Sequence, residues 1–471
     1  HTTTASRLEI LRAQCPRDPR VLAELAGLRF AQRQWASAAA LAERALAFAP
    51  HDPYAADVLA SSRFMLDDVP GALRAWNQVG RPYLDSVRIT GLRRTRYSLV
   101  ALALGLTPNT QLTDSQFLLA RRRIEAMPDH GATRVALRPD RDGFAVVDVA
   151  VVEKAAVPRT PVMWAAMGAQ AALERELALV LPGGLGQGET WSASWGWWEN
   201  RPRVAIEFAA PRATWPRGVR VRAAWESQAY GPDAAAAVRE ERLQAQLALG
   251  DWLTANLRAE LFAGVDTWTR LDRRIDRTLR IGGTVDRRFV RDRVSASLSV
   301  NRWAGLDGSP GFSAAALNLS FRSRRDPVGF VLVGRAGAAA ATSDAPLALW
   351  GGAGEGRGRG PLLRAHRLLR EGRIDGTVFG RRLVHLTLEG QRWLPRPSLL
   401  RIGGAVFADG AFASRRPSFA TGRPFQVDAG VGLRLRVPGI GGTFRVDYAR
   451  GLRDNARSVL ASWQAIDVQG P

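Results

Sequence analysis

The segment QVDAGVGLRLRVPGIGGTFRVDYARGLRD, residues 426–454, decides the fold class of this chain. On both sides of a Pro-Gly turn at 438–439, apolar residues occupy every second position: Val427, Ala429, Val431, Leu433 and Leu435, and then Phe444, Val446 and Tyr448. Successive side chains of a strand point to opposite faces, so this spacing predicts two strands that each have one apolar face. The opposite face carries glycine and full charges.

The same period of two recurs from about residue 160 to the end of the chain, for example at Val219–Trp225 and Val294–Val300. These residues, about 310 of them, suffice for roughly 14 to 16 strands with turns, as in a medium outer-membrane barrel. A soluble sandwich also has strands with one apolar face. However, the many charges on the polar face suit a water-filled lumen better than a filled interior. We therefore predict a transmembrane antiparallel β-barrel of sixteen strands over 160–471, with these charges facing the lumen: Arg220, Arg222, Arg434, Arg436, Arg445 and Asp447.

Composition excludes several other classes of protein. The 471 residues include 66 Lys plus Arg against 44 Asp plus Glu, 46% hydrophobic residues and one Cys. That apolar content excludes a disordered polycation, and one Cys excludes an intrachain disulfide framework. Apolar runs such as Leu99–Leu106 are too short for a membrane-spanning helix. The chain begins at His1 rather than Met, which fits removal of a secretory signal but equally fits another N-terminal boundary.

Residues 1–80 have helical periodicity and repeat at a spacing of 34. Asp18-Pro19 recurs as Asp52-Pro53, and three matched pairs follow at the same spacing: Leu25 with Leu59, Ala26 with Ala60, and Ala38 with Ala72. This spacing and the small residues resemble tetratricopeptide repeats, whose helix pairs stack on one another. Because two repeats leave apolar faces uncovered, we expect the array to dock on the next domain or to continue beyond this sequence. The resemblance implies a scaffold or a groove for periplasmic or complex subunits.

Residues 83–154 predict a small α+β domain with the order strand, helix, helix, strand, strand. The expected strands and helices lie at 87–89, 98–104, 114–127, 133–138 and 144–153. The segments SVRITGL at 86–92, LGLTPNTQLT at 104–113 and VVDVAVVEK at 146–154 resemble a POTRA domain. Such a resemblance implies an exposed strand edge that pairs with an extended client segment.

The C-terminal third resembles the barrel of the outer-membrane assembly and two-partner-secretion superfamily, also called bacterial surface antigens. The similar segments are GGAGEGRGRGPLLRAH at 351–366, GRRLVHLTLEGQRWL at 380–394 and RIGGAVFADGAF at 401–412. The resemblance implies a loop that folds into the lumen and presents Arg364 to Glu389 and Asp409 on the inner wall. Alternation with Val384, Leu386 and Leu388 independently places Glu389 inside. The loop tip reads Arg364-Ala365-His366 where the family has Arg-Gly-aromatic, and His366 is a further candidate for anchoring the loop.

No catalytic or cofactor signature is present in the sequence. The five histidines lie far apart, which argues against a metal site. Gly184–Gly188 superficially resembles a phosphate loop, but a strand rather than a helix is expected after it. There is neither a GxSxG elbow nor a Walker motif. We therefore expect no enzyme activity, no cofactor and no metal.

These observations predict a bacterial outer-membrane protein with periplasmic N-terminal domains that inserts or translocates unfolded or extended polypeptide clients. Its partners would be those clients and the outer-membrane lipid. Two alternatives remain open at this point. One is an exopolysaccharide export porin, since helical repeats before a barrel also occur there. The other is a soluble basic protein that binds nucleic acid, although the arginines are spread along the chain rather than gathered in one segment, so we expect no nucleic acid.

Overall fold

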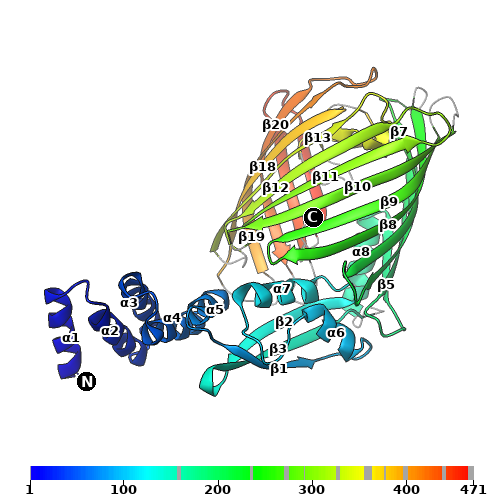
Figure 1. Cartoon of the computed structure of the whole chain (residues 1–471). Helices are drawn as coiled ribbons and strands as arrows, with labels where there is room; N and C mark the ends of the chain where they lie inside the picture. The colour runs from blue at the N-terminus through cyan, green and yellow to red at the C-terminus, as the bar shows by residue number, and fades with distance from the viewer. Residues whose placement is uncertain are drawn as a thin grey trace. The chain divides into compact units, whose positions relative to one another are not determined.

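The computed structural model describes residues 2–155, 161–233, 237–269, 275–290, 292–324, 329–354, 363–375, 378–395, 401–436 and 442–464 (Figure 1). The chain divides into two compact units: 1–154 with 185–188, and 155–184 with 189–471. The turn at 438–439 and most of the glycine-rich stretch before Arg364 lie outside the described residues.

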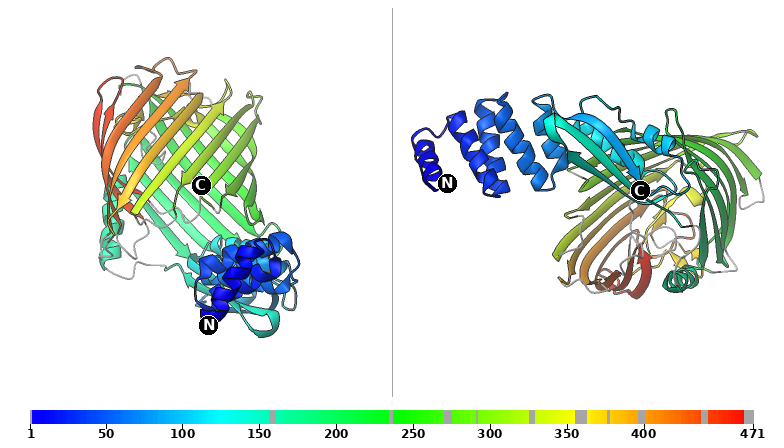
Figure 2. Two further views of the ribbon diagram at one scale, coloured as in Figure 1. Left: turned by 90° about the vertical axis from the view of Figure 1, so that its left-hand side faces the viewer. Right: turned by 90° about the horizontal axis from the view of Figure 1, so that it is seen from below.

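The N-terminal unit begins with five helices stacked in a row (Figure 2): α1 (Thr2–Gln14), α2 (Pro19–Ala31), α3 (Trp35–Phe48), α4 (Pro53–Met65) and α5 (Val69–Asn77). Asp18 and Asp52 occupy equivalent N-cap positions, each accepting hydrogen bonds from two backbone N–H groups, with proline at the first helical position. The matched alanines Ala26, Ala38, Ala60 and Ala72 are fully buried. The spacing of 34 therefore corresponds to a structural repeat.

The helices continue into a three-stranded sheet with two further helices. In chain order these are β1 (Tyr83–Thr90), α6 (Tyr97–Leu104), α7 (Asp114–Glu125), β2 (His130–Pro139), the short 3-10 turn η1 (Arg141–Gly143) and β3 (Phe144–Glu153). The strand order is β1-β3-β2, with β1 parallel and β2 antiparallel to β3. One continuous core runs from Leu22 to Val151. As expected from the small number of repeats, the helical row docks on the α/β part.

Glu153, at the end of β3, holds the segment that follows β1. Its carboxylate accepts hydrogen bonds from the backbone N–H groups of Arg93, Arg94 and Thr95 at 2.9–3.1 Å. Burial acts to raise the pKa of this carboxyl, but these donations outweigh it and lower the pKa to about 2.

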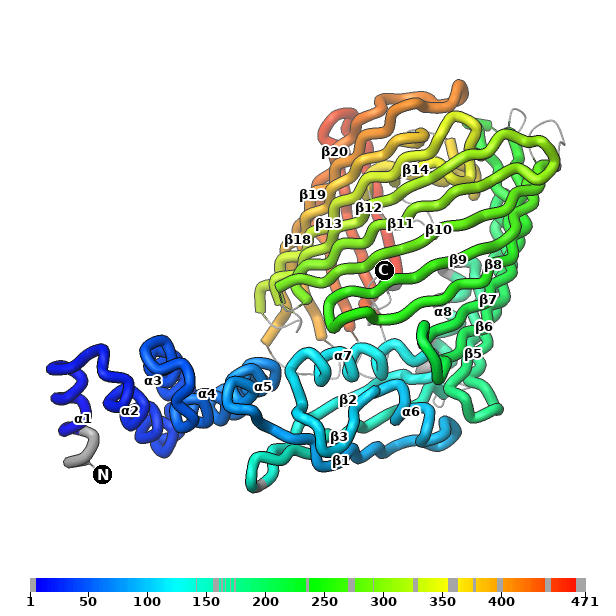
Figure 3. The backbone as a smooth tube through the Cα atoms, in the orientation of Figure 1, coloured from blue at the N-terminus to red at the C-terminus, as the bar shows by residue number. Residues whose placement is uncertain are grey.

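The second unit is a large antiparallel sheet arranged as a barrel, preceded by helix α8 (Pro161–Glu174) (Figure 3). Consecutive long strands pair from β4 to β13 and from β18 to β22, β13 pairs directly with β18, and the strand order then returns from β22 to β4. The long strands are β4 (Glu176–Pro182), β5 (Thr190–Trp198), β6 (Arg201–Pro211), β7 (Gly218–Tyr230), β8 (Val238–Thr254), β9 (Leu257–Thr269), β10 (Ile275–Phe289), β11 (Val294–Gly305), β12 (Phe312–Arg322), β13 (Gly329–Ala341), β18 (Arg382–Trp393), β19 (Arg401–Ser414), β20 (Phe425–Arg436), β21 (Thr443–Gly451) and β22 (Arg457–Gln464). The described residues thus supply fifteen wall strands, against the sixteen predicted.

The predicted alternation is confirmed in the wall. On β18, Val384, Leu386 and Leu388 are 56%, 49% and 47% exposed, whereas Thr387 and Glu389 between and after them are 7% and 5% exposed. The apolar face of the strand therefore points away from the lumen. Among the described residues, no helix is both long enough and apolar enough to cross a membrane.

The described parts of the connection from β13 to β18 contact the lumen side of the wall. It contains the 3-10 turn η2 (Leu347–Leu349) and four two-residue strands: β14 (Gly351–Gly352), β15 (Leu369–Arg370), β16 (Arg373–Ile374) and β17 (Phe379–Gly380). Ile374 pairs with Tyr230 of β7. Because β7 is distant from β13 and β18 in the strand order, this inner segment reaches across the lumen to another part of the wall.

Candidate functional site

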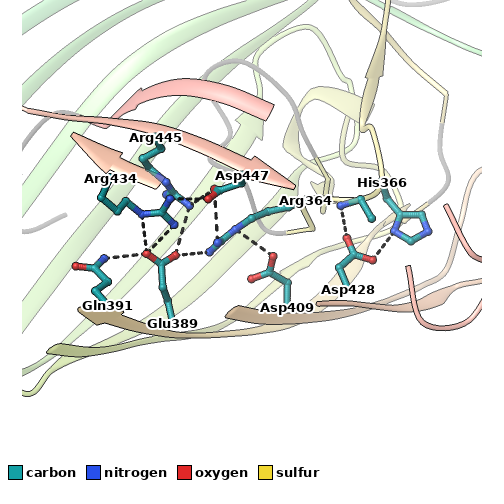
Figure 4. Close-up of polar contacts among 10 residues, drawn as sticks. Arg364, His366, Glu389, Gln391, Asp409, Asp428, Arg434, Arg445 and Asp447 are labelled. Atoms are coloured by element: carbon teal, nitrogen blue, oxygen red, sulfur yellow. Dashed lines mark hydrogen bonds and ion pairs between the residues drawn. The ribbon is translucent and has the colours of Figure 1, made fainter. Parts of the chain in front are cut away.

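Arg364, on the inner segment, is buried among three carboxylates of the wall (Figure 4). Its Nη2 lies 2.8 Å from Glu389 Oε2, its Nε 3.2 Å from Asp409 Oδ2, and its Nη1 3.6 Å from Asp447 Oδ2. Its Cζ also lies 3.7 Å from the ring centre of Phe407. Planar guanidinium groups suit such contacts because they donate in several directions while stacking on an aromatic face.

Each carboxylate reaches this point because of its place on a strand. Glu389 lies on β18, Asp409 on β19 and Asp447 on β21, all on the lumen-facing side of the wall. The register pairs Thr387 with Asp409, so Glu389 is offset by two residues along the neighbouring strand. Side chains two residues apart share a face, and the two acids therefore converge on one guanidinium.

Two further arginines complete the cluster. Arg434 of β20 donates from Nε and Nη2 to Glu389 Oε1 at 3.0 and 2.8 Å. Arg445 of β21 lies directly opposite Arg434, and its Nη2 donates to Asp447 Oδ2 at 2.8 Å. Three guanidinium groups thus face three carboxylates in a buried site. Balanced charge is what makes such burial tolerable, and removing one member leaves an uncompensated charge.

His366 makes a second attachment of the same segment to the wall. Its Nδ1 lies 2.7 Å from Asp428 Oδ1, and its Nε2 lies 2.9 Å from Asp454 Oδ2. The backbone N–H of Ala365 donates to the other oxygen of Asp428 at 2.6 Å. Both ring nitrogens can donate at once only in the imidazolium form, so this geometry suits a protonated histidine.

The other lumen-facing charges predicted from the sequence lie apart from Arg364. Arg220 and Arg222 of β7 both approach Glu207, and Arg220 also approaches Glu260 at 3.5 Å. Arg436 lies at the end of β20 opposite Arg401, outside the cluster. The structure therefore brings together Arg364, Glu389, Asp409, Arg434, Arg445 and Asp447, and leaves the remaining three elsewhere on the wall.

Sequence reasoning missed Asp454 and the partner role of Asp428. Asp428 lies on the polar side of the alternation in 426–436, which was the available signal. Sequence reasoning also missed a second inner cluster on β8–β11, where Asp266 accepts hydrogen bonds from Arg242 Nε at 3.0 Å and from Trp303 Nε1 at 2.7 Å. In addition, Arg242 stacks on Trp268 at 4.6 Å. The available signal for this second cluster was again the alternation, which puts Asp266 and Trp268 on the face opposite Leu261 and Val265.

The described part of the chain contains no group of three His, Cys, Asp or Glu side chains arranged to hold a metal ion. The site instead offers charge-assisted contacts that fix the inner segment to the wall.

The sequence matches no protein-family model and no curated protein. Among solved structures, the chain is similar to CdiB from Escherichia coli, with 13% identity over 81% of this chain and 76% of that chain, and a TM-score of 0.53. It is also similar to BamA from Haemophilus ducreyi lacking POTRA domains 1–3 (15% identity, 82% and 84%, TM-score 0.48) and to CdiB from Acinetobacter baumannii (11%, 81% and 72%, TM-score 0.48). At the level of the fold, the likeness to CdiB from Escherichia coli agrees with the predicted antiparallel β-barrel.

Proposed function

We propose that this chain is an outer-membrane barrel protein that inserts or translocates polypeptide clients without covalent chemistry. The single observation that carries the proposal is the inner segment fixed by Arg364 to Glu389 and Asp409 inside a wall whose outer face is apolar. A segment that fills a lumen and is held by ion pairs acts as a plug, and it needs no reactive group. Similarity of fold to CdiB and BamA supports the same proposed function.

Location in a membrane is supported by the dimensions and surface of the wall. Strands β5–β13 and β18–β21 have 9 to 17 residues each, enough to cross the apolar layer of a bilayer when tilted. Large apolar residues such as Leu261, Ile281 and Val406 are more than half exposed along these strands. A surface of this kind is unfavourable in water and is suited to lipid. Sixteen strands remain our prediction for the complete wall.

The N-terminal unit supports a role in client handling. We interpret residues 83–154 as a POTRA-like domain in the periplasm and residues 1–80 as tetratricopeptide-like repeats that bind complex subunits. In the order β1-β3-β2, both β1 and β2 are edge strands. A free edge offers backbone N–H and C=O groups to an extended polypeptide, which is how β-augmentation recognises clients with little regard to sequence.

The proposal is tested by reconstituting the full chain in liposomes and adding an unfolded outer-membrane barrel protein as client. Compared with protein-free liposomes, we expect faster acquisition of protease resistance by the client. The control is the double variant Glu389→Gln/Asp409→Asn, which removes two acids of the cluster and should reduce the effect. Equal client folding in liposomes with and without the protein would refute the function. Export of an anionic polysaccharide is the less favoured alternative, since the fold neighbours do not support it.

A further inference from the structure

A hollow is present on the wall at the end of the barrel where the inner segment connects β13 to β18. Its volume is about 580 Å³, within the range of small-molecule sites. It is lined by Val300 of β11, Ser313, Ala314 and Ala315 of β12, Ala340 to Ser343 at the end of β13, and Arg381, Arg382 and Arg415.

The hollow lies on the outer face of the wall rather than in the lumen. The strand registers align Val300, Ala315, Ala340 and Arg382 in one row across four strands. Val300 is 49% exposed, and Arg382 shares its face with Val384, which belongs to the outward apolar side. Ala315 and Ala340 are the smallest side chains of the row, so they form an apolar floor between bulkier neighbours.

Positive charge gathers at the rim of this hollow. Arg382 and Arg415 are exposed, and within the described residues neither side chain makes a hydrogen bond or an ion pair. Arg381 lies 5.7 Å from the ring centre of Trp350, so part of its charge is already engaged. Nearby, Arg302 donates to the hydroxyl of Ser313 at 3.2 Å. The Asp344 carboxylate accepts a hydrogen bond from the Ser343 hydroxyl at 3.0 Å.

We propose that this hollow, which we call the rim hollow, binds an anionic membrane phospholipid through its phosphate headgroup. The inference rests on the proposed membrane location. An acyl chain would lie over Ala315 and Ala340, and the phosphate would meet Arg382 and Arg415. Guanidinium groups recognise phosphate oxygens through paired N–H donors. An unpaired arginine on a lipid-facing wall is unfavourable, and an anionic headgroup supplies the missing partner.

The test uses the full chain in a neutral detergent and measures lipid retention by native mass spectrometry. Dimyristoylphosphatidic acid and dimyristoylphosphatidylcholine are added at equal concentration, so that only the headgroup differs. We expect the wild type to retain the phosphatidic acid about fivefold more strongly, equivalent to about 1 kcal/mol. Arg382→Ala/Arg415→Ala should abolish that preference. Arg457→Ala is the matched control, because Arg457 shares the outward face of β22 with Val459, which is 69% exposed, and starts that strand at the same end of the barrel.

Two further measurements distinguish binding of a lipid in the rim hollow from binding of phosphate alone. Ala340→Phe fills the floor of the rim hollow and should weaken retention of phosphatidic acid while both arginines remain. Inorganic phosphate at millimolar concentration should not displace the lipid, and full displacement would overturn the proposal. Equal retention by the wild type and the double arginine variant would also overturn it. A protein that is monodisperse without detergent would refute the membrane location itself, whereas a detergent-requiring protein without headgroup preference would refute only the lipid site.

Discussion

Arg364 is the residue on which the inner segment depends most. We expect Arg364→Ala to leave Glu389 and Asp409 buried without their shared partner, at a cost of about 3–5 kcal/mol to the attachment. The segment should then leave its place more often, giving larger or more frequent single-channel openings in planar bilayers. Arg364→Lys should give an intermediate result, because an ammonium group cannot form the planar, branched contacts of a guanidinium.

The matched control for this experiment is Arg370→Ala. Arg370 lies on the same inner segment, is exposed, and makes no ion pair with the residues described. Its loss should leave conductance unchanged. If the Arg364 and Arg370 variants behave alike, the inner segment is not held by the arginine-carboxylate cluster.

Glu153 makes the N-terminal unit sensitive to acid. Its pKa in the folded state is about 2, below the ordinary value of about 4.3. A depressed pKa stabilises the fold above the unfolded-state value, and this contribution is lost as pH falls from about 4.3 towards 2. Chemical denaturation of residues 1–154 should therefore show a loss of stability in that window that is smaller in Glu153→Gln.

At neutral pH we expect Glu153→Gln to destabilise the same fragment by about 1–3 kcal/mol, because it loses charge-assisted acceptance of three backbone N–H groups. Glu43→Gln is the control, since the Glu43 side chain is half exposed. An identical pH profile for wild type and Glu153→Gln would show that this carboxylate is not held as described.

What the sequence could reveal at this scale differs from residue to residue. Alternation placed Glu389 inside, and family resemblance joined it to Arg364 and Asp409. Neither could assign Arg434 to Glu389, because these residues are separated by 45 positions and meet only through the register of intervening strands. The contacts of His366 with Asp428 and Asp454 depend on the path of the inner segment. The sequence of this segment has no periodicity, so its path could not be predicted.

At the scale of the single strand, an experiment can test which of two neighbouring side chains points to the lipid and which points to the lumen. On β12, Leu317 belongs to the exposed face, whereas Ala316 faces the lumen with Ala339 opposite it. In a bilayer, Leu317→Arg should cost about 2–4 kcal/mol near the midplane, while Ala316→Arg should be nearly neutral in a wet lumen. The measurement is the folded fraction in liposomes, read from heat-modifiable mobility over a urea series.

The two adjacent positions control for each other, because the substitution and the strand are the same. If Ala316→Arg were the more damaging change, the lumen would be dry and the apolar face would be covered by something other than lipid. Strand facing was predictable because a period of two survives in the long segments. The number of strands was less predictable from the sequence. Strand β4 has 7 residues and β22 has 8, and such short segments carry little periodic signal.

At the scale of the whole molecule, the division into units follows from where the apolar residues are buried. The helical repeats and the α/β part share one core, so the sequence boundary near residue 80 is not a boundary between separate compact units. Periodicity detects a change of secondary structure, whereas compact units are defined by contacts between elements. Near residue 154 the periodicity changes and the first compact unit also ends, because the wall strands that follow put their apolar side chains outward.

This difference in burial predicts opposite behaviour for the two parts when they are expressed separately. Residues 1–154 bury their apolar side chains internally, so we expect a fragment that is monomeric without detergent and unfolds in one cooperative transition. The fragment lacks residues 185–188, of which Gly186 accepts a hydrogen bond from the Arg96 N–H, and losing one such bond should cost about 1 kcal/mol. Residues 155–471 expose apolar side chains along most strands and should aggregate unless detergent is present. Size-exclusion chromatography with and without detergent distinguishes the two, and a monodisperse, detergent-free barrel fragment would contradict the assignment of its outer face to lipid.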